Sequence, residues 1–209
     1  MDAPALTRFL DASTTHALRY RRWRLALEAE GTRTGLAPSA GRTLLAAMLL
    51  EKERFAIERA FRALGLLHAR EEVRRIYLGF GDVDPKLRAS SRELLEALVR
   101  PPLRGALLML VDPSEDAATA EQAAFYDAPR SFIGTGLLEE LLTGSSAALR
   151  ALAAYHAAER GLQHLRPRLR ALRETASPEL RAVLERAEGM LDAQAAAREP
   201  QPARRADVH

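Results

Sequence analysis

The stretch that decides the fold is AIERAFRALGLL, residues 56–67. Its apolar residues recur three and four positions apart, which is the period of one face of an α-helix. Almost the whole chain repeats this spacing, and no stretch alternates apolar and polar residues for long enough to predict a strand. We therefore predict an all-helical protein. The buried face of this stretch is expected to consist of Ile57, Ala60, Phe61, Leu64 and Leu67.

The composition excludes several classes of chemistry. The chain has 209 residues and no cysteine, so disulfides, thiolate nucleophiles and cysteine-ligated metal sites are excluded. All of its 31 basic residues except Lys52 and Lys86 are arginines, and 28 acidic residues oppose them. A net charge of +3 is too small to indicate nucleic-acid binding. No apolar run approaches the ~20 residues that span a bilayer, so we expect a cytoplasmic chain without a membrane helix.

A Leu-Arg pair recurs near the start of four predicted helices: Leu18-Arg19, Leu87-Arg88, Leu149-Arg150 and Leu180-Arg181. The arginines are 69, 62 and 31 residues apart, which approximates two, two and one copies of a unit just above thirty residues long. A candidate helix cap precedes each pair, namely Thr15, Asp84, Ser146 and Ser177. Such a side chain accepts an otherwise unpaired backbone N–H, and proline at the next position fits the first turn. We predict four capped helices with a buried leucine in the first turn.

The arginine of each copy opposes the helix dipole, at a cost of about 0.3–1 kcal/mol when exposed. Its recurrence predicts a partner, most simply a carboxylate or carbonyl in the loop of the neighbouring repeat. In that interpretation the repeats are linked by a ladder of Arg19, Arg88, Arg150 and Arg181. The alternative is a set of solvated side chains in an arginine-rich chain.

The pattern resembles the HEAT repeat. Leu149–Leu162, and Leu165–Leu169 with Ser177–Arg181, look like two adjacent HEAT units. Leu18–Arg21, Glu58–Leu67, and Arg74–Tyr77 with Asp84–Ala89 are similar to the HEAT-repeat region that follows the membrane part of bacterial ATP/ADP-translocase-like, major-facilitator-type transporters. The resemblance covers about residues 12–192. It implies an α-solenoid of antiparallel helix pairs, and it assigns no transport activity to a chain without membrane helices.

The expected domain boundaries follow from composition. We expect one HEAT-like domain over residues 1–192 and a disordered tail rich in Ala, Gln, Pro and Arg over 193–209. Thr32–Gly41 is predicted to be a loop, followed by a long helix from about Arg42 to Leu67. Residues 112–135 break the repeat period, which predicts either a degenerate repeat with one short helix near Ala118–Tyr126 or a mobile excursion of the chain.

Candidate catalytic and metal-binding patterns have simpler structural interpretations. Asp82, Asp84 and Glu93 partly match a calcium loop, but Leu87 stands where that loop requires glycine. His156 and Glu159 lie three apart on one predicted helix, without the further ligand pairs of helical metal sites. The carboxylates of Glu139-Glu140 and Glu51–Glu53 are expected on solvated helix faces. We predict no catalytic residue, metal or cofactor.

Trp23 lies in the basic run Arg19–Arg24, where arginines could contact phosphates and the ring could stack on a base. Apolar Leu18, Leu25 and Ala26 instead favour burial of half this helix in the core.

The sequence therefore favours a non-catalytic HEAT-repeat module that binds a protein partner or the cytosolic face of a membrane protein. The alternative from a different class is a HEAT-like DNA-binding protein or DNA glycosylase, which needs net positive charge on one face. Acidic residues are interspersed with arginines along nearly every predicted helix, which disfavours that alternative.

Overall fold

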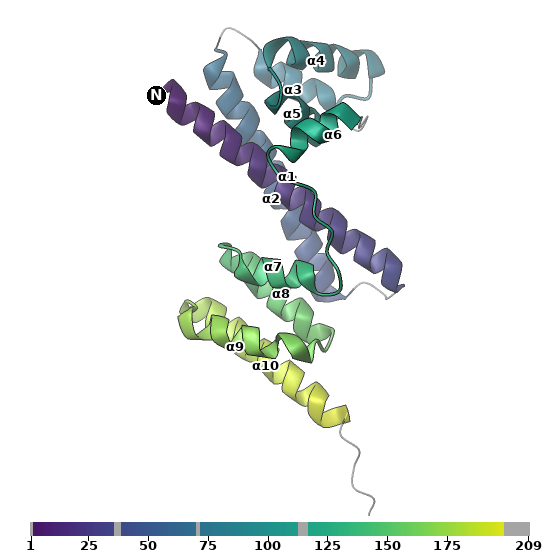
Figure 1. Cartoon of the computed structure of the whole chain (residues 1–209), viewed down its shortest axis with the longest axis vertical. Helices are drawn as coiled ribbons and strands as arrows, with labels where there is room; N and C mark the ends of the chain where they lie inside the picture. Colours follow the sequence, from purple (N-terminus) through teal and green to yellow (C-terminus); the bar gives the residue numbers. More distant parts are fainter. Residues whose placement is uncertain (1, 36–38, 70–71, 113–116, 199–209) are drawn as a thin grey trace, which may run out of the picture. The chain divides into compact units, whose positions relative to one another are not determined.

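The structure is a computed structural model that describes residues 2–35, 39–69, 72–112 and 117–198 (Figure 1). Throughout these residues every regular element is a helix, which confirms the predicted all-helical class. The first part contains α1 (Ala3–Thr34), α2 (Ala40–Leu67), α3 (Val73–Phe80), α4 (Pro85–Leu98), α5 (Leu103–Val111) and α6 (Ala117–Ala124). The second contains α7 (Gly136–Thr143), α8 (Ala147–Glu159), the short 3-10 helix η1 (Gln163–Leu165), α9 (Arg166–Thr175) and α10 (Pro178–Arg198).

The chain divides into two compact units. Unit 1 comprises Met1–Glu30 and Ala47–Ser131, and unit 2 comprises Gly31–Ala46 and Phe132–His209. The boundaries fall inside α1 and α2, so each of these helices contributes residues to both units. None of the helices in the described ranges is long and apolar enough to cross a membrane.

Unit 1 is built around the predicted face of α2. Its core contains buried residues of five other helices: Leu10, Ala17 and Leu18 of α1; Val73, Ile76 and Phe80 of α3; Leu95 of α4; Ala106, Leu107, Leu108 and Leu110 of α5; and Ala123 of α6. From α2 it takes Ile57, Ala60, Phe61 and Leu64, with Leu67 packed against them, which confirms the face predicted from residues 56–67. Burial of each large apolar side chain contributes about 1.5–3 kcal/mol. This cluster is therefore the main source of stability in unit 1.

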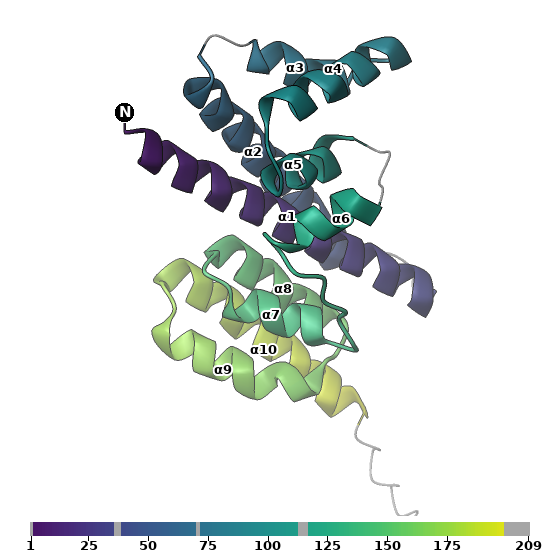
Figure 2. The same cartoon turned by 45° about the horizontal axis from the view of Figure 1, so that its top comes forward.

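Unit 2 is a cluster of shorter helices in which α7 packs on α8, α8 on α10 and α9 on α10 (Figure 2). Helix α8 buries the alanines Ala153, Ala154, Ala157 and Ala158, and α10 buries Leu184, Ala187 and Leu191. Small side chains on one helix let a neighbour approach closely and accept larger side chains from it.

The N-terminus of α2, which belongs to unit 2, is capped from two directions. Ser39 Oγ accepts a hydrogen bond from the Arg42 backbone N–H at 3.2 Å, and Glu159 Oε2 of α8 accepts one from the Gly41 N–H at 2.8 Å. A carboxylate is favoured at this end of a helix by the dipole. A Cβ at Gly41 would lie 2.6 Å from Glu159 Oε2, so only glycine permits this approach.

Two predicted boundaries change. Helix α10 continues to Arg198, so the predicted tail begins too early, and Gln194 Nε2 donates a hydrogen bond to Ala158 O at 3.0 Å. The alanines of this segment explain the extension, since alanine is the strongest helix former. Residues 199–209 lie outside the described residues. Helix α1 likewise runs to Thr34, into the predicted loop, whereas α6 lies close to the predicted short helix.

Candidate interaction surface

Three of the four predicted caps begin helices. The side chain of Asp84 accepts a hydrogen bond from the Lys86 N–H at 2.9 Å at the start of α4. Ser146 accepts one from the Leu149 N–H at 3.4 Å at the start of α8, and Ser177 Oγ lies 3.5 Å from the Leu180 nitrogen at the start of α10. These contacts satisfy backbone donors that the first helical turn leaves unpaired.

The fourth cap and one of the buried leucines are predicted wrongly. Thr15 lies inside α1, which begins at Ala3, so no helix starts there. Leu149 and Leu180 are buried as predicted, but Leu87 is half exposed, because the buried residues of α4 are Ser91 and Leu95.

The arginines of the Leu-Arg pairs have partners, but different ones from those predicted. Arg88 Nη1 donates to the carbonyls of Asp82 at 2.8 Å and Val83 at 3.0 Å. Arg150 Nε donates to the Gly144 carbonyl, and Arg181 Nη2 to the Ala176 carbonyl at 3.2 Å. Each acceptor lies in the loop that precedes the arginine's own helix. The predicted link between neighbouring repeats is therefore corrected to a link within a helix pair.

The positions of these carbonyls explain why a cation recurs in a first turn. Gly144 and Ala176 are the C-cap residues of α7 and α9, and Asp82 follows Gly81, the C-cap of α3. The last carbonyls of a helix lack intrahelical partners and form its negative end. Arg150 and Arg181 therefore oppose the dipole of their own helix but bind the negative end of the helix before it, whereas Arg88 binds loop carbonyls just beyond the C-cap of α3.

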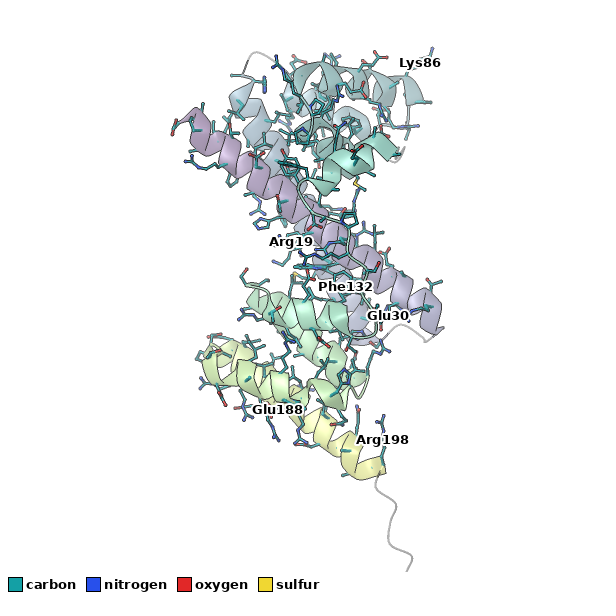
Figure 3. The ribbon with its side chains drawn as sticks, viewed as in Figure 1. Arg19, Glu30, Lys86, Phe132, Glu188 and Arg198 are labelled. Atoms are coloured by element: carbon teal, nitrogen blue, oxygen red, sulfur yellow. The ribbon has the colours of Figure 1, made fainter. Side chains whose placement is uncertain are left out.

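Arg19 differs from the other three because it lies in the interior of α1 (Figure 3). Its Nε is 3.9 Å from Asp127 Oδ1, and the neighbouring Arg22 Nε is 2.7 Å from Asp127 Oδ2. The four arginines do not come together as one ladder, since each contacts a different segment of the chain.

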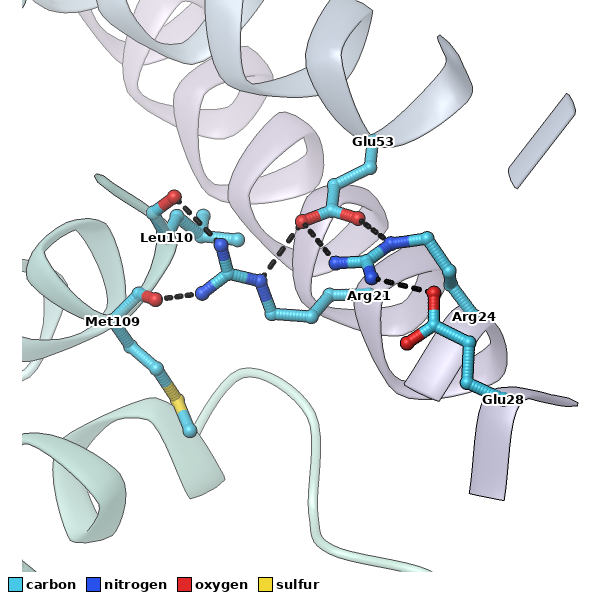
Figure 4. A network of polar contacts seen from close by, with 6 residues as sticks. All are labelled: Arg21, Arg24, Glu28, Glu53, Met109 and Leu110. Atoms are coloured by element: carbon cyan, nitrogen blue, oxygen red, sulfur yellow. Dashed lines mark hydrogen bonds and ion pairs between the residues drawn. The ribbon is translucent and has the colours of Figure 1, made fainter. Parts of the chain in front are cut away.

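The basic run of α1 forms a polar network inside unit 1 (Figure 4). Glu53 of α2 is only 3% exposed and receives Arg21 Nε on one oxygen and Arg24 Nε on the other, both at 2.8 Å. Arg21 also donates to the carbonyl oxygens of Met109 and Leu110 at the end of α5. The hydrogen bond to Glu53 raises the pKa of Arg24. The prediction that Glu53 is solvated is therefore wrong, and the network connects α1, α2 and α5.

Trp23 is buried, as the core interpretation of this helix predicts. Leu25 is half exposed instead of buried, and Leu27 takes the core position two residues later. The indole is thus unavailable for stacking on a base.

The carboxylate and histidine pairs form structural contacts. His156 Nδ1 lies 3.2 Å from Ser39 Oγ and 3.8 Å from Glu159 Oε2, beside the N-terminus of α2. Glu188 of α10, labelled in Figure 3, is buried and accepts a hydrogen bond from Arg173 at 3.2 Å. In the part of the chain that the structure describes, no group of three His, Asp or Glu residues is arranged to hold a metal ion.

A hollow of about 440 Å³ lies between the C-terminal part of α2 and helix α3 in unit 1. It is lined by Gly65, Glu72, Val73, Arg74, Arg75 and Leu78. Gly65 contributes no side chain, and the nearest atom to a Cβ built there would be Val73 Cβ at 3.7 Å. Leu78 is 61% exposed, and Leu66, which follows Gly65, is 58% exposed. Leu78 is thus an exposed leucine in the lining of the hollow.

A second set of exposed side chains lies on the side of α2 that faces away from the core. Phe55 and Leu66, both more than half exposed, are eleven residues apart, which is about three helical turns. They therefore lie on one side of α2, opposite the face buried in the core. Arg59 and Arg62 occupy the same side between them and are exposed.

Comparison with known protein families, characterised proteins and solved structures reveals no match. The HEAT and transporter resemblances therefore remain predictions from the sequence.

Proposed function

We propose that the chain is a non-catalytic protein-interaction module whose helix pairs stack as a HEAT-type α-solenoid. In this proposal it is associated with, or derived from, the cytosolic part of a bacterial transporter-like membrane protein. The observation that carries the interaction role is the hollow between α2 and α3, with exposed Leu78 in its lining. An exposed apolar residue at a hollowed surface is typical of binding sites.

The packing of consecutive helices supports the stacked arrangement. Helix α3 packs on α4, α5 on α6, α7 on α8, and α9 on α10. A helix pair of this kind cannot bury its apolar face alone and needs neighbours, which is the physical basis of solenoid proteins.

The DNA-directed alternative has less support. Arg21, Arg22 and Arg24 contact carboxylates of the chain itself, so the basic run is already neutralised in part. Its test is duplex-DNA binding at two salt concentrations. Tight binding that weakens steeply with salt would favour DNA over a protein partner.

Site-directed photo-crosslinking tests the interaction role. The residue p-benzoylphenylalanine replaces Leu78 in one variant and Leu94 in the other, and both are introduced into cells of the source organism. Leu94 is the matched control, an exposed leucine on the neighbouring helix α4. Illumination is expected to link the Leu78 variant, and not the Leu94 variant, to a discrete protein.

The same experiment tests the proposed association with a membrane protein. Recovery of the crosslinked protein with the membranes supports the transporter link, and recovery only outside the membranes contradicts it. Equal labelling from both positions, or none from position 78, contradicts the interaction role itself.

A further inference from the structure

We infer that the outer side of helices α1 and α2 in unit 1 binds the surface of a membrane that contains anionic phospholipids. This side, the α1–α2 face, carries exposed apolar side chains among basic ones. Its apolar residues are Phe9, Phe55 and Leu66, which are 47%, 56% and 58% exposed. The inference concerns the lipid itself and a surface other than the hollow, so it goes beyond the proposed function.

The interactions between the two helices define how α1 and α2 lie along each other. Arg21 of α1 pairs with Glu53 of α2. Burial, and then the charges of Arg19 and Arg59, lower the pKa of His16, so Arg59 lies near this imidazole. A step back along α1 from Arg21 to His16 thus corresponds to a step forward along α2 from Glu53 to Arg59. The two helices therefore run antiparallel in unit 1.

This alignment gathers the apolar side chains on one face. Phe9 lies seven residues before His16 in α1, and Leu66 lies seven residues after Arg59 in α2. Seven residues are about two turns, so both side chains are displaced in the same direction and stay on the same side of their helices. Phe55 lies one turn from Arg59 in the opposite direction. The three apolar side chains therefore flank the position where His16 and Arg59 meet.

Positive charge predominates on this face. Within residues 8–19 and 51–66, all of which the structure describes, its cations are at least partly exposed: Arg8, Arg19, Lys52, Arg59 and Arg62. Its carboxylates are those of Glu51 and Glu58. Asp11 instead accepts a hydrogen bond from Tyr126, beyond the end of α6. The excess of cations complements the anionic head groups of a membrane.

A lipid surface suits both kinds of side chain on this face. Phenylalanine and leucine insert at the boundary between head groups and acyl chains, while neighbouring arginines keep their charged ends among the phosphates. The bilayer yields to such side chains, so two adjacent helices bind it without a pocket. A single-stranded nucleic acid would pair with the arginines and stack on the phenylalanines, but it would leave the exposed Leu66 without a role.

Vesicle binding by the full chain tests the inference. The protein is titrated with vesicles of phosphatidylcholine that contain about a quarter of phosphatidylglycerol, and with vesicles of phosphatidylcholine alone, and bound protein is measured by co-sedimentation. At low salt we expect binding to the anionic vesicles to be at least about tenfold tighter. High salt is expected to release the chain, because it screens the charges. Equal binding to the two kinds of vesicle, or binding to neither, overturns the inference.

A pair of charge variants locates the binding. Arg59→Glu is expected to weaken binding to the anionic vesicles at least about tenfold, and Arg54→Glu less than about threefold. Arg54 is the matched control, because it is also exposed on α2 and its replacement changes the net charge equally. It lies five residues before Arg59, which turns it by about 140° around the helix axis. Equal losses in the two variants overturn the inference.

A second pair tests the apolar contribution without a change in charge. Phe55→Gln is expected to weaken binding about tenfold, whereas Leu94→Gln on α4 leaves it unchanged. The four replaced side chains are exposed, so circular dichroism should show an unaltered fold. Equal effects of Phe55→Gln and Leu94→Gln overturn the inference.

Two other occupants of the face would also be recognised. Tighter binding of single-stranded oligothymidylate than of anionic vesicles, weakened by Phe55→Gln, would overturn the inference in favour of a nucleic acid. Dimerisation of the chain that Phe55→Gln abolishes would overturn it in favour of a second copy.

Failure of the inference is distinguishable from failure of the proposed function, because the vesicles contain no protein partner. If position 78 crosslinks a discrete protein but the vesicles bind alike, the interaction role stands and lipid binding is wrong. If position 78 crosslinks nothing but the anionic vesicles bind as expected, lipid binding stands and the interaction role is wrong. Washing the crosslinked membranes with high salt releases adducts that only lipid charge holds, whereas an adduct to an integral membrane protein remains.

Discussion

Replacing Glu53 by glutamine is expected to destabilise unit 1 by about 3 kcal/mol, because two guanidinium groups lose the buried carboxylate that balances their charge. The Glu53 carboxylate is almost completely buried, and both of its oxygens accept hydrogen bonds from Arg21 and Arg24. Glutamine keeps the shape of the side chain but removes the charge, and its NH₂ group points a donor at other donors.

The magnitude follows from how much water reaches the network. Removing one partner of a buried ion pair costs about 3–5 kcal/mol. The side chains of Arg21 and Arg24 retain 21% and 18% exposure, so water solvates them in part. Arg21 also keeps the carbonyls of Met109 and Leu110, and Arg24 keeps Glu28. The expected value therefore lies at the lower end of that range.

Urea unfolding followed by the fluorescence of Trp23 measures this effect. Trp23 is the single tryptophan, is buried, and belongs to unit 1, so its signal reports on the unit that holds the network. The matched control is Glu51→Gln, an exposed carboxylate on the same helix that is expected to change stability by no more than about 0.5 kcal/mol.

Two results would refute this reasoning. One is a loss for Glu53→Gln that equals the loss for the control. The other comes from adding Arg24→Gln to Glu53→Gln. If the two residues interact, the double variant is less destabilised than the sum of the single variants, and strict additivity would contradict the pairing.

Three further predictions concern other parts of the chain. Arg150→Ala is expected to destabilise unit 2 by about 1.5 kcal/mol in thermal unfolding, the lower end of the range for a hydrogen bond to a charged group. The control is Arg186→Ala, at an exposed position of α10, which is expected to change the stability by no more than about 0.5 kcal/mol. Gly65→Ala is expected to stabilise unit 1 by up to about 1 kcal/mol in urea, because alanine reduces the conformational entropy of the unfolded chain. Gly65 lies in the last turn of α2, and a Cβ there meets Val73 at an ordinary 3.7 Å; a loss of stability would show that the contact is tighter than described. Burial, and then the charges of Arg19 and Arg59, lower the pKa of His16. The unfolded chain therefore binds the proton more readily, and stability falls as pH falls through about 6.5 toward the lower folded-state pKa. His16→Gln should reduce this fall between pH 7.5 and 5, and an unchanged pH profile would contradict it.

Features that are encoded locally could be predicted from the sequence. The face from Ile57 to Leu67 follows from helical period, and the caps at Asp84 and Ser146 follow from the side chains that bond a first-turn N–H. In each case the residues that decide the structure lie within a few turns of one another.

Features that depend on distant partners could not be predicted in this way. Glu53 stands in the stretch Glu51–Glu53, whose local pattern is that of a solvated face, and its burial depends on Arg21 and Arg24 of another helix. Thr15 has the residue type of a cap, but α1 begins well before it, so no unpaired first-turn N–H is present. The hollow at Gly65 arises only when α3 packs against α2.

The arginines of the Leu-Arg pairs show how one motif gives rise to two interpretations. The pattern of a cap, two residues, leucine and arginine at Ser146–Arg150 predicts a repeat unit whose arginine links successive units. In the structure, Ser146 closes the N-terminus of α8, while Arg150 closes the C-terminus of α7.

At the start of α4, Asp84 likewise closes the N-terminus, while Arg88 binds the loop carbonyls of Asp82 and Val83 that follow α3. The motif therefore joins two consecutive helices, and it occurs in the connections α3–α4, α7–α8 and α9–α10. Its recurrence supports helix pairs as the building unit, but it does not by itself distinguish a regular HEAT stack from other arrangements of those pairs. That distinction depends on contacts between one helix pair and the next. The hydrogen bonds of these arginines described above stay within a helix pair and do not form such contacts.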